Sequence, residues 1–231
     1  MNLAELQTEL RIILRDPSVE SSFTVWINDE LLQLAQEFDF PGLKLQTPAS
    51  LVCINTAYLY NLSAATHASL FTFHKKLWKV HHPNTLQGIR IERTLRAIDI
   101  LDPAHTATGT NITTVGTEYE QLATHPMANQ TLSLWFYRRP LAMVADNDAP
   151  TWLPDSFHVK VIMPRVVLRA MRLYPELATA DGGDSTRALQ LWSERLRQGM
   201  YGDGYSIGLL EALDLPMRFR GRLAPTRAVT G

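Results

Sequence analysis

Histidines are the first residues of this chain whose type would allow metal or acid–base chemistry. His81 and His82 are adjacent, and His67 and His74 precede them. A zinc site needs further cysteine or carboxylate ligands at a regular spacing, and none accompanies these histidines. Adjacent ligands are also unfavourable on a strand, where neighbouring side chains point to opposite faces. The sequence therefore favours ordinary surface histidines, and it predicts neither a metal nor another cofactor.

Acidic residues offer two other kinds of chemistry. Asp146-Asn147-Asp148 resembles the start of a calcium-binding loop, but the required glycine and the later glutamate are missing, so a polar loop leading into Pro150 is favoured. Glu118 with Glu120, or Glu30 with Glu37, would suit sugar hydrolysis only if each pair flanked a cleft. Acidic residues are commonly exposed, so surface positions are favoured.

The C-terminal segment is basic and also contains apolar residues. Such a segment suits an acidic protein groove or nucleic acid, or it is a solvated terminus. The chain as a whole has a net charge of −1, so it has no general attraction to DNA, and a protein groove is favoured over a DNA-binding module. The residues predicted to dock there are Met217, Arg218, Phe219, Arg220, Arg222 and Arg227.

Composition describes a folded protein without obvious export or membrane signals. Of the 231 residues, 45% are apolar, which argues against disorder. Cys53 is alone, so no disulfide can form within the chain, which suits a reducing compartment. The first residues lack the features of a signal peptide, and no apolar run of about 18 residues predicts a membrane span.

The N-terminal third of the chain predicts helices and then strands. Apolar residues recur at spacings of three and four, which predicts a helix over 3–15 that ends before Asp16-Pro17. A second helix, capped by Ser22 or Thr24, is predicted to end before Pro41-Gly42. Its predicted buried stripe is Ile27, Leu31, Leu34 and Phe38, with Asn28, Asp29, Gln33, Gln36 and Glu37 facing solvent.

Residues 43–153 are predicted to form an antiparallel β module. Strands are expected at 51–54, 58–60, 77–80, 89–91 and 132–137, a short helix at 93–98 and an exposed loop at 106–114. Within Trp135-Phe136-Tyr137, alternation places the middle ring on the opposite face from its neighbours. Core packing is favoured there over a platform for stacking single-stranded nucleic acid.

Helices are predicted to return at Asp155. Phe157, Val161, Val166, Val167, Ala170, Met171 and Tyr174 indicate a helix that is buried on several sides, kinked or delayed by Pro164. After Gly182-Gly183, a last helix buries Leu189, Trp192, Leu196 and Met200. The predicted fold is α+β. Residues 1–42 and 154–201 form a helical bundle, 43–153 the inserted β module, and 202–231 an extended docking tail.

The order of these elements resembles the head-to-tail adaptor, or connector, proteins of tailed bacteriophages, particularly those of short-tailed phages. The motifs that carry the resemblance are Asp16-Pro17, Trp26-Ile27-Asn28, Tyr58 to Leu62, Phe136 to Pro140, and Asp146 to Leu153. Each motif is short, and their order over about residues 1–200 is the specific signal. The chain departs from the pattern in longer segments at 63–76 and 103–117, and at Glu30 and Leu32, where alanine is more usual.

The resemblance implies a structural virion protein at the head-to-tail junction, assembled in the host cytoplasm, and not an enzyme. It leaves open, as an alternative, a peptidoglycan-degrading enzyme associated with the virion that would use Glu118 or Glu120. It implies a dodecameric ring of identical subunits below the portal protein, contacting a tail nozzle or other tail proteins. The ring would extend the channel for double-stranded DNA without sequence-specific contacts, and would help to retain and deliver the genome. The tail would bind the portal, and deleting residues 205–231 is expected to leave the fold intact but to abolish portal binding.

Overall fold

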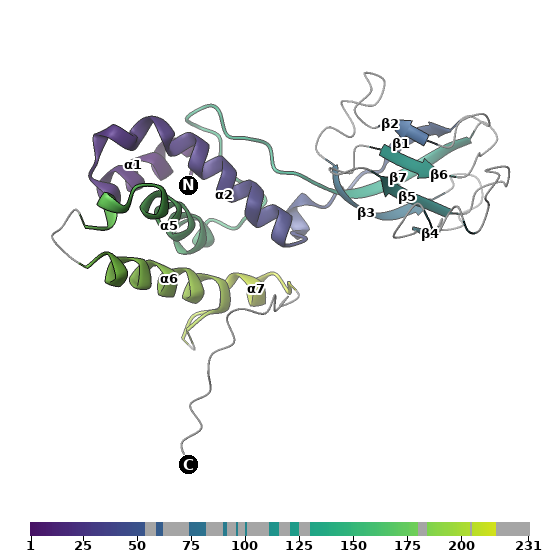
Figure 1. The fold of residues 1–231 in the computed structure, drawn as a ribbon. Coiled ribbons are helices and arrows are strands. Elements are labelled where there is room, and N and C mark those ends of the chain that lie inside the picture. Colours follow the sequence, from purple (N-terminus) through teal and green to yellow (C-terminus); the bar gives the residue numbers. More distant parts are fainter. Residues whose placement is uncertain are drawn as a thin grey trace, which may run out of the picture. The chain divides into compact units, whose positions relative to one another are not determined.

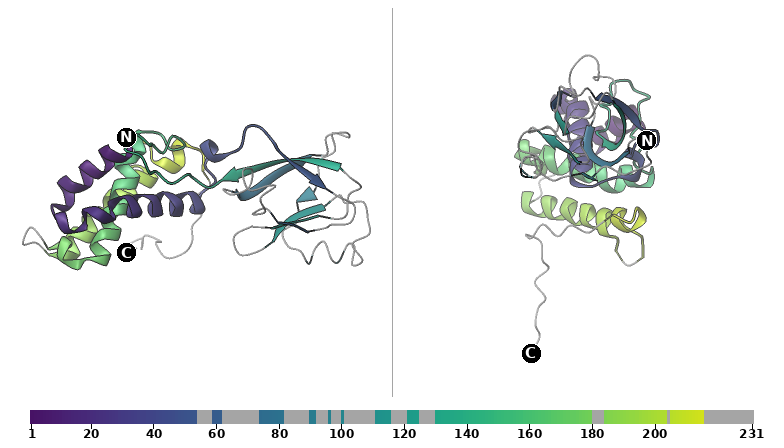
Figure 2. Two further views of the ribbon diagram at one scale, coloured as in Figure 1. Left: turned by 90° about the horizontal axis from the view of Figure 1, so that it is seen from above. Right: turned by 90° about the vertical axis from the view of Figure 1, so that its right-hand side faces the viewer.

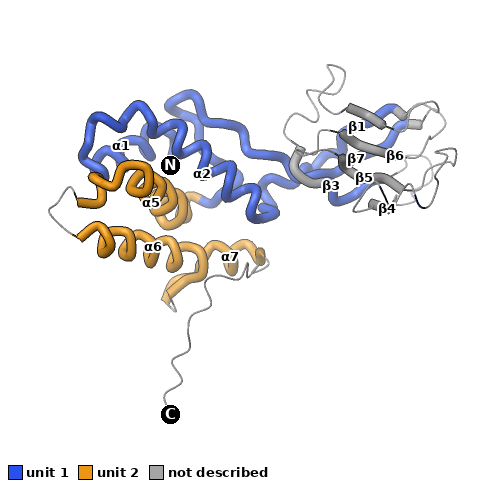
Figure 3. The backbone as a smooth tube through the Cα atoms, in the orientation of Figure 1, with its two compact units in different colours: residues 1–154 blue, residues 155–231 orange. Residues whose placement is uncertain are grey.

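The structure is a computed structural model that has an α+β fold. It describes residues 1–53, 59–61, 74–81, 90–91, 96, 100, 111–115, 121–124, 130–179, 184–203 and 205–215 (Figure 1). The chain divides into two compact units, Met1–Pro154 and Asp155–Gly231 (Figure 3). No helix in the described part of the chain is long and apolar enough to cross a bilayer.

The first unit opens with helix α1, Leu3–Leu14, whose length agrees with the predicted helix. Its buried face is the leucine stripe Leu3, Leu6, Leu10 and Leu14. Arg15 closes the helix in the left-handed conformation, with φ of 55°. Asp16 accepts a hydrogen bond from the amide of Ser18, and Pro17 begins a 3₁₀ turn, Pro17–Ser22. The predicted break at Asp16-Pro17 is confirmed.

Helix α2, Phe23–Glu37, follows that turn directly. Ser22 occupies the capping position but its side chain caps nothing, so this prediction is wrong. The reason is that Ser22 has helical dihedral angles, because the 3₁₀ turn runs straight into α2. Thr24 instead accepts a hydrogen bond from Gln7 of α1 at 2.8 Å, and Arg11 of α1 pairs with Glu20 at 2.9 Å.

The buried face of α2 is wider than predicted. Ile27, Leu31 and Leu34 are buried as expected, and the other buried members of the helix are Phe23, Trp26, Glu30 and Ala35. Phe38 was predicted to join them but is only half-buried. Its backbone is extended, with φ of −129° and ψ of 152°, so the chain has already left the helix there.

Strands follow a short 3₁₀ turn, Pro41–Leu43. One sheet has three antiparallel strands in the order β1–β7–β3, and a second has four strands in the order β2–β6–β5–β4 (Figure 1). Figure 2 shows the strands from two further sides. The strands are β1 (Ala49–Cys53), β2 (Leu59–Asn61), β3 (His74–His81), β4 (Arg90–Ile91), β5 (Asn111–Val115), β6 (Gln121–Thr124) and β7 (Gln130–Arg138).

The described part of residues 43–153 contains strands near the predicted positions, and it differs from the prediction in two details. Strands β4 and β5 pair in parallel, which the intervening residues 92–110 are long enough to allow. Asn111–Val115 is a strand, although residues 106–114 were predicted to be a loop. Its β-branched Ile112, Thr113, Thr114 and Val115 favour strand over turn. Most of the predicted helix at 93–98 lies outside the described residues.

The second unit begins as helix at Ser156, contains a π-helical turn, His158–Ile162, and continues as α5, Met163–Leu173. A 3₁₀ turn, Pro175–Ala178, leads toward α6, Ser185–Tyr201, and α7 spans Leu209–Ala212. The predicted disturbance at Pro164 is confirmed. Because proline has no N–H, the carbonyl of Lys160 has no donor four residues later, and the helix takes a wider turn there.

Burial in the second unit follows the prediction closely in α5 but not in α6. Phe157, Val161, Val166, Val167, Ala170 and Met171 are buried, while Tyr174 is exposed. In α6 only Gly199 and Met200 are buried. The predicted partners Leu189, Trp192 and Leu196 are half-buried, so most of the apolar stripe of this helix keeps contact with solvent.

Candidate assembly surfaces

The segment after β7 returns to the helices of the first unit and is held by one asparagine. The Asn28 amide of α2 donates to the carbonyl of Met143 at 2.9 Å, and its carbonyl oxygen accepts from the amide of Met143 at 2.8 Å. The side chain therefore pairs with Met143 as a neighbouring strand would. Asn28 was predicted to face solvent, and this prediction is wrong because the sequence gives no sign of a segment 115 residues away returning to it.

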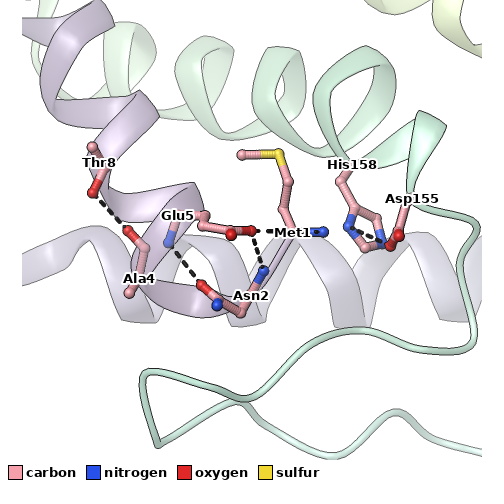
Figure 4. A network of polar contacts seen from close by, with 7 residues as sticks. All are labelled: Met1, Asn2, Ala4, Glu5, Thr8, Asp155 and His158. Atoms are coloured by element: carbon pink, nitrogen blue, oxygen red, sulfur yellow. Dashed lines mark hydrogen bonds and ion pairs between the residues drawn. The ribbon is translucent and has the colours of Figure 1, made fainter.

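The same segment closes the start of α1. The first amides of a helix have no partner within it. Here Leu3 donates to the carbonyl of Asp148 at 2.8 Å and Ala4 to that of Asp146 at 3.2 Å. Asn2 and Glu5 complete the cap: the side chain of each accepts from the backbone amide of the other at 2.9 Å (Figure 4).

Asp148 has a structural use that replaces the calcium-loop interpretation. One carboxylate oxygen accepts hydrogen bonds from the amides of Val144 and Ala145 at 2.7 and 2.8 Å. These bonds, led by the one from Val144, lower the pKa of Asp148 below its ordinary value. No group of three or more metal-ligating side chains occurs among the described residues. The polar loop predicted from the sequence is a cap and a turn.

A short apolar segment near the hydrogen bonds of Asn28 and Asp148 has exposed side chains. We call Leu141–Ala145 the display segment. Met143 is buried, but Val144 is 83% exposed and Leu141 is 68% exposed. Val25, one turn before Asn28 on α2, is also exposed. Large exposed apolar side chains whose backbone is fixed by hydrogen bonds are typical of a surface that meets another protein.

The residues that follow α2 pack tightly against the segment that follows β7. Phe40 and Trp152 meet edge to face, with ring centroids 4.7 Å apart. A side chain on Gly42 would bring a Cβ within 2.7 Å of the carbonyl oxygen of Trp152. The backbone of Lys44 forms an antiparallel β-bridge with that of Tyr137, and the amide of Leu45 donates to the carbonyl of Phe136 at 3.0 Å. The Lys44 ammonium lies 3.7 Å from the centroid of the Trp78 ring.

The β1–β7–β3 sheet has one buried and one half-exposed face. Leu132, Leu134 and Phe136 are buried, while Trp135 and Tyr137 alternate to the other face and are half-buried, as the alternation predicted. Trp135 is covered in part by Lys79, at 4.8 Å, and by the ring of His81, at 5.3 Å. These contacts occupy the indole face that a stacking platform would need.

The second unit carries a basic surface on α6. Arg187, Leu191 and Arg195 are spaced by four, so they lie on one side of the helix, and all three are exposed. Arg195 also lies over the Trp192 ring at 4.5 Å. Glu194 is bound by Arg197 through two hydrogen bonds of 2.6 and 2.8 Å. We call Arg187, Leu191 and Arg195 the α6 stripe.

A stapled turn follows α6. Asp203 accepts hydrogen bonds from the amides of Ser206, at 2.7 Å, and Tyr205, at 3.0 Å, and from the Ser206 hydroxyl, at 3.0 Å. The Ser206 amide is the main cause of the lowered pKa of Asp203. Gly202, with φ of 84°, pairs with Ile207 and lets the chain reverse. Tyr205 and Ile207 are exposed at the tip.

The residues predicted from sequence to do chemistry are not brought together by the described structure. Glu30 is buried and Glu37 is exposed, two turns apart on α2, so they do not flank one cleft. Glu118 and Glu120 lie outside the described residues, as do His67 and His82. His158, which the sequence did not single out, is fully buried 3.6 Å from the Asp155 carboxylate, within the second unit (Figure 4).

The predicted docking residues of the tail lie outside the described residues, which end at residue 215. The preceding residues 205–215 belong to the folded second unit, where Leu209, Leu210 and Leu215 are buried. A truncation meant to leave the fold intact must therefore begin after Leu215, and not at residue 205.

The surfaces described above indicate a class of protein. Where the structure is described, polar side chains hold backbone in place and exposed apolar side chains are presented on fixed segments, which is the pattern of an assembly component. The family model described as SU10 adaptor protein matches residues 1–207. The chain therefore belongs to the SU10 adaptor protein family, as its resemblance to phage head-to-tail adaptors indicated. No curated protein is found to match the chain.

Family membership gives the broad role directly. The chain is a structural adaptor protein of a phage and a virion component, and such membership suggests a non-enzymatic protein that assembles with itself and with portal and tail proteins. The match ends at Ile207, in the stapled turn. The predicted docking residues, Met217 to Arg227, therefore lie beyond the region that the family model matches.

Proposed function

We propose that the chain is the subunit of a dodecameric ring that lies beneath the portal, at the head-to-tail junction. The ring joins the capsid to the tail nozzle or other tail proteins, extends the channel for packaged double-stranded DNA, and helps to retain and deliver the genome. The match to the adaptor family over residues 1–207 is the observation that carries this proposal. The ring is assembled in the host cytoplasm, and the helices of residues 1–42 and 154–201 form one bundle within each subunit.

Portal binding is assigned in this proposal to the C-terminal tail. Met217 and Phe219 supply apolar anchors, and Arg218, Arg220, Arg222 and Arg227 supply positive charge for an acidic groove on the portal.

The mass of the purified protein, measured by light scattering with and without the cognate portal, tests the ring. A species of twelve chains, alone or on the portal, is the expected result. A chain that stays monomeric under both conditions would remove the ring from the proposal.

Portal binding by the tail is tested separately. Deleting residues 216–231 is expected to leave urea unfolding of the described units unchanged and to abolish portal binding. Thr226→Ala, a change within the tail that removes neither charge nor anchor, serves as the matched control. A truncated protein that binds the portal like the full chain would show that the docking surface lies elsewhere.

A further inference from the structure

The stapled turn and α7 together present a surface of apolar and acidic side chains. Its exposed members are Tyr201, Asp203, Tyr205, Ile207, Glu211 and Asp214, and we call these six residues the acidic tip. A hollow of about 380 Å³ lies at this surface, lined by Tyr201, Tyr205, Ser206, Ile207 and Glu211. Exposed apolar side chains around a hollow are typical of a surface that receives a side chain from another segment.

The acidic tip is held in one shape by the chain around it. Asp203 staples the turn through its three hydrogen bonds, and Ile207 forms a β-bridge with the backbone at the end of α6. The amide of Leu215 donates to the carbonyl of Leu210 at 2.8 Å, and both leucines are buried. A surface that is fixed in this way loses little conformational freedom when it binds another segment.

The charge of this part of the chain is negative however widely it is counted. Residues 198–215 contain three acidic residues and no lysine or arginine, a net charge of −3. Including the preceding residues from Glu194 leaves a net charge of −2, and residues 155–215 together carry −1. The lowered pKa of Asp203 keeps its carboxylate charged at neutral pH. A complementary segment is therefore apolar and positively charged.

The residues that follow Leu215 in the sequence have this composition. Residues 216–231 contain four arginines and no acidic residue, a net charge of +4. Their large apolar residues, Met217, Phe219 and Leu223, are interleaved with the arginines. An apolar residue beside a guanidinium group matches a hollow beside a carboxylate in both shape and sign of charge.

The same residues are also close enough to reach the acidic tip of their own chain. Phe219 is four residues beyond Leu215, so its Cα can lie up to about 14 Å from that of Leu215. Leu215 is hydrogen-bonded to Leu210, the residue before Glu211, which lines the hollow. The hollow is therefore within reach of the apolar residues without any change in the described structure.

We propose that residues 216–231 bind the acidic tip of their own chain when no portal is present. An apolar side chain, Met217 or Phe219, fills the hollow, and arginines lie beside the three carboxylates. The consequence for assembly rests on the proposed function, because the portal has to displace the tail from the tip before it binds the same residues. A tail that is docked for about nine-tenths of the time lowers the apparent affinity for the portal about tenfold.

Hydrogen exchange in the full chain, measured without portal, tests the contact. The amides of residues 217–222 are expected to exchange about tenfold slower than in a synthetic peptide of residues 216–231. Glu211→Lys is expected to remove this protection by repelling the arginines, and Tyr205→Ser by removing an apolar contact; the side chain of Tyr205 is fully exposed, so its loss leaves the fold unaffected. Glu176→Lys makes the same charge change at an exposed position elsewhere in the second unit and is the matched control.

Tail amides that exchange as fast in the full chain as in the peptide would overturn the contact, and so would protection that survives both Glu211→Lys and Tyr205→Ser. Protection that disappears on dilution would place the tail on a second copy of the chain, which also contradicts the proposal.

Portal titration tests the competition. Glu211→Lys is expected to bind the portal about tenfold more tightly than Glu176→Lys, and equal affinities would show that the tip does not compete. If deleting residues 216–231 leaves portal binding unchanged, the proposed docking function fails, whereas exchange in the chain without portal still decides the contact with the tip. The two failures are therefore distinguishable.

Discussion

Asn28→Ala is expected to release the segment after β7 from α2. The substitution removes two part-buried hydrogen bonds to Met143, of 2.8 and 2.9 Å, each worth about 1 kcal/mol net. Alanine is the better helix former by roughly 0.5 kcal/mol, which offsets part of that loss. The expected net destabilisation is therefore about 1.5 kcal/mol, and it falls on the packing of residues 139–154.

Urea unfolding measures the global effect, and hydrogen exchange at Met143 measures the local one. The Met143 amide is expected to exchange about tenfold faster or more in the variant, because 1.4 kcal/mol corresponds to a factor of ten. Gln33→Ala, an exposed position on the same helix, is the control and should change neither quantity. Asn28→Asp keeps the acceptor for the Met143 amide but places a carboxylate oxygen against its carbonyl, so it should not rescue the protein. Exchange at Met143 that is as slow in Asn28→Ala as in Gln33→Ala would refute the reasoning.

Three other changes test separate parts of the structure. Gly199→Ala should destabilise the second unit by about 1–2 kcal/mol in a urea titration, because the added Cβ would overlap the carbonyl of Lys160. This loss is expected although alanine has the better helix propensity. Ser193→Ala, on the exposed side of α6, is the control. Asn2→Ala should cost about 1 kcal/mol in thermal or urea unfolding by opening the capping box with Glu5, and an unchanged midpoint would show that Asp146 and Asp148 suffice as the cap. The folded-state pKa of Asp203 is lowered, so its contribution to stability is present above the ordinary pKa of 3.8 and is lost as pH falls through the lowered pKa. Asp203→Asn should therefore flatten the acid limb of a curve of unfolding free energy against pH, and an unaltered acid limb would contradict this.

Local signals predicted the helices well because the forces that define them are local. The leucine spacing in α1, the proline after Asp16 and the apolar faces around Val166 each act within a few residues. The error at Phe38 has a local cause too: periodicity continued through it, but the backbone had already become extended. Element type was readable from the sequence wherever one pattern ran for ten residues or more.

Long-range pairing was not readable in the same way. The parallel pairing of β4 with β5 and the contact of Asn28 with Met143 depend on which distant segments meet, and no single-sequence pattern encodes that choice. The half-exposed stripe of α6 was misjudged for a related reason. Periodicity shows which face is apolar, but it cannot distinguish a face buried within the chain from one that another subunit covers.

Four polar residues, one of them the Asp148 that first suggested calcium binding, share one physical task in the described structure. Asn2, Asn28, Asp148 and Asp203 all bond to backbone groups in segments that have no helix or strand partner there. Such groups cost free energy if they are left unpaired, and short amide and carboxylate side chains can satisfy them. The result is a set of segments that are rigid before assembly. An adaptor protein that assembles with itself and with other proteins gains from this, because less of its binding free energy is lost in ordering the surfaces that make the contacts.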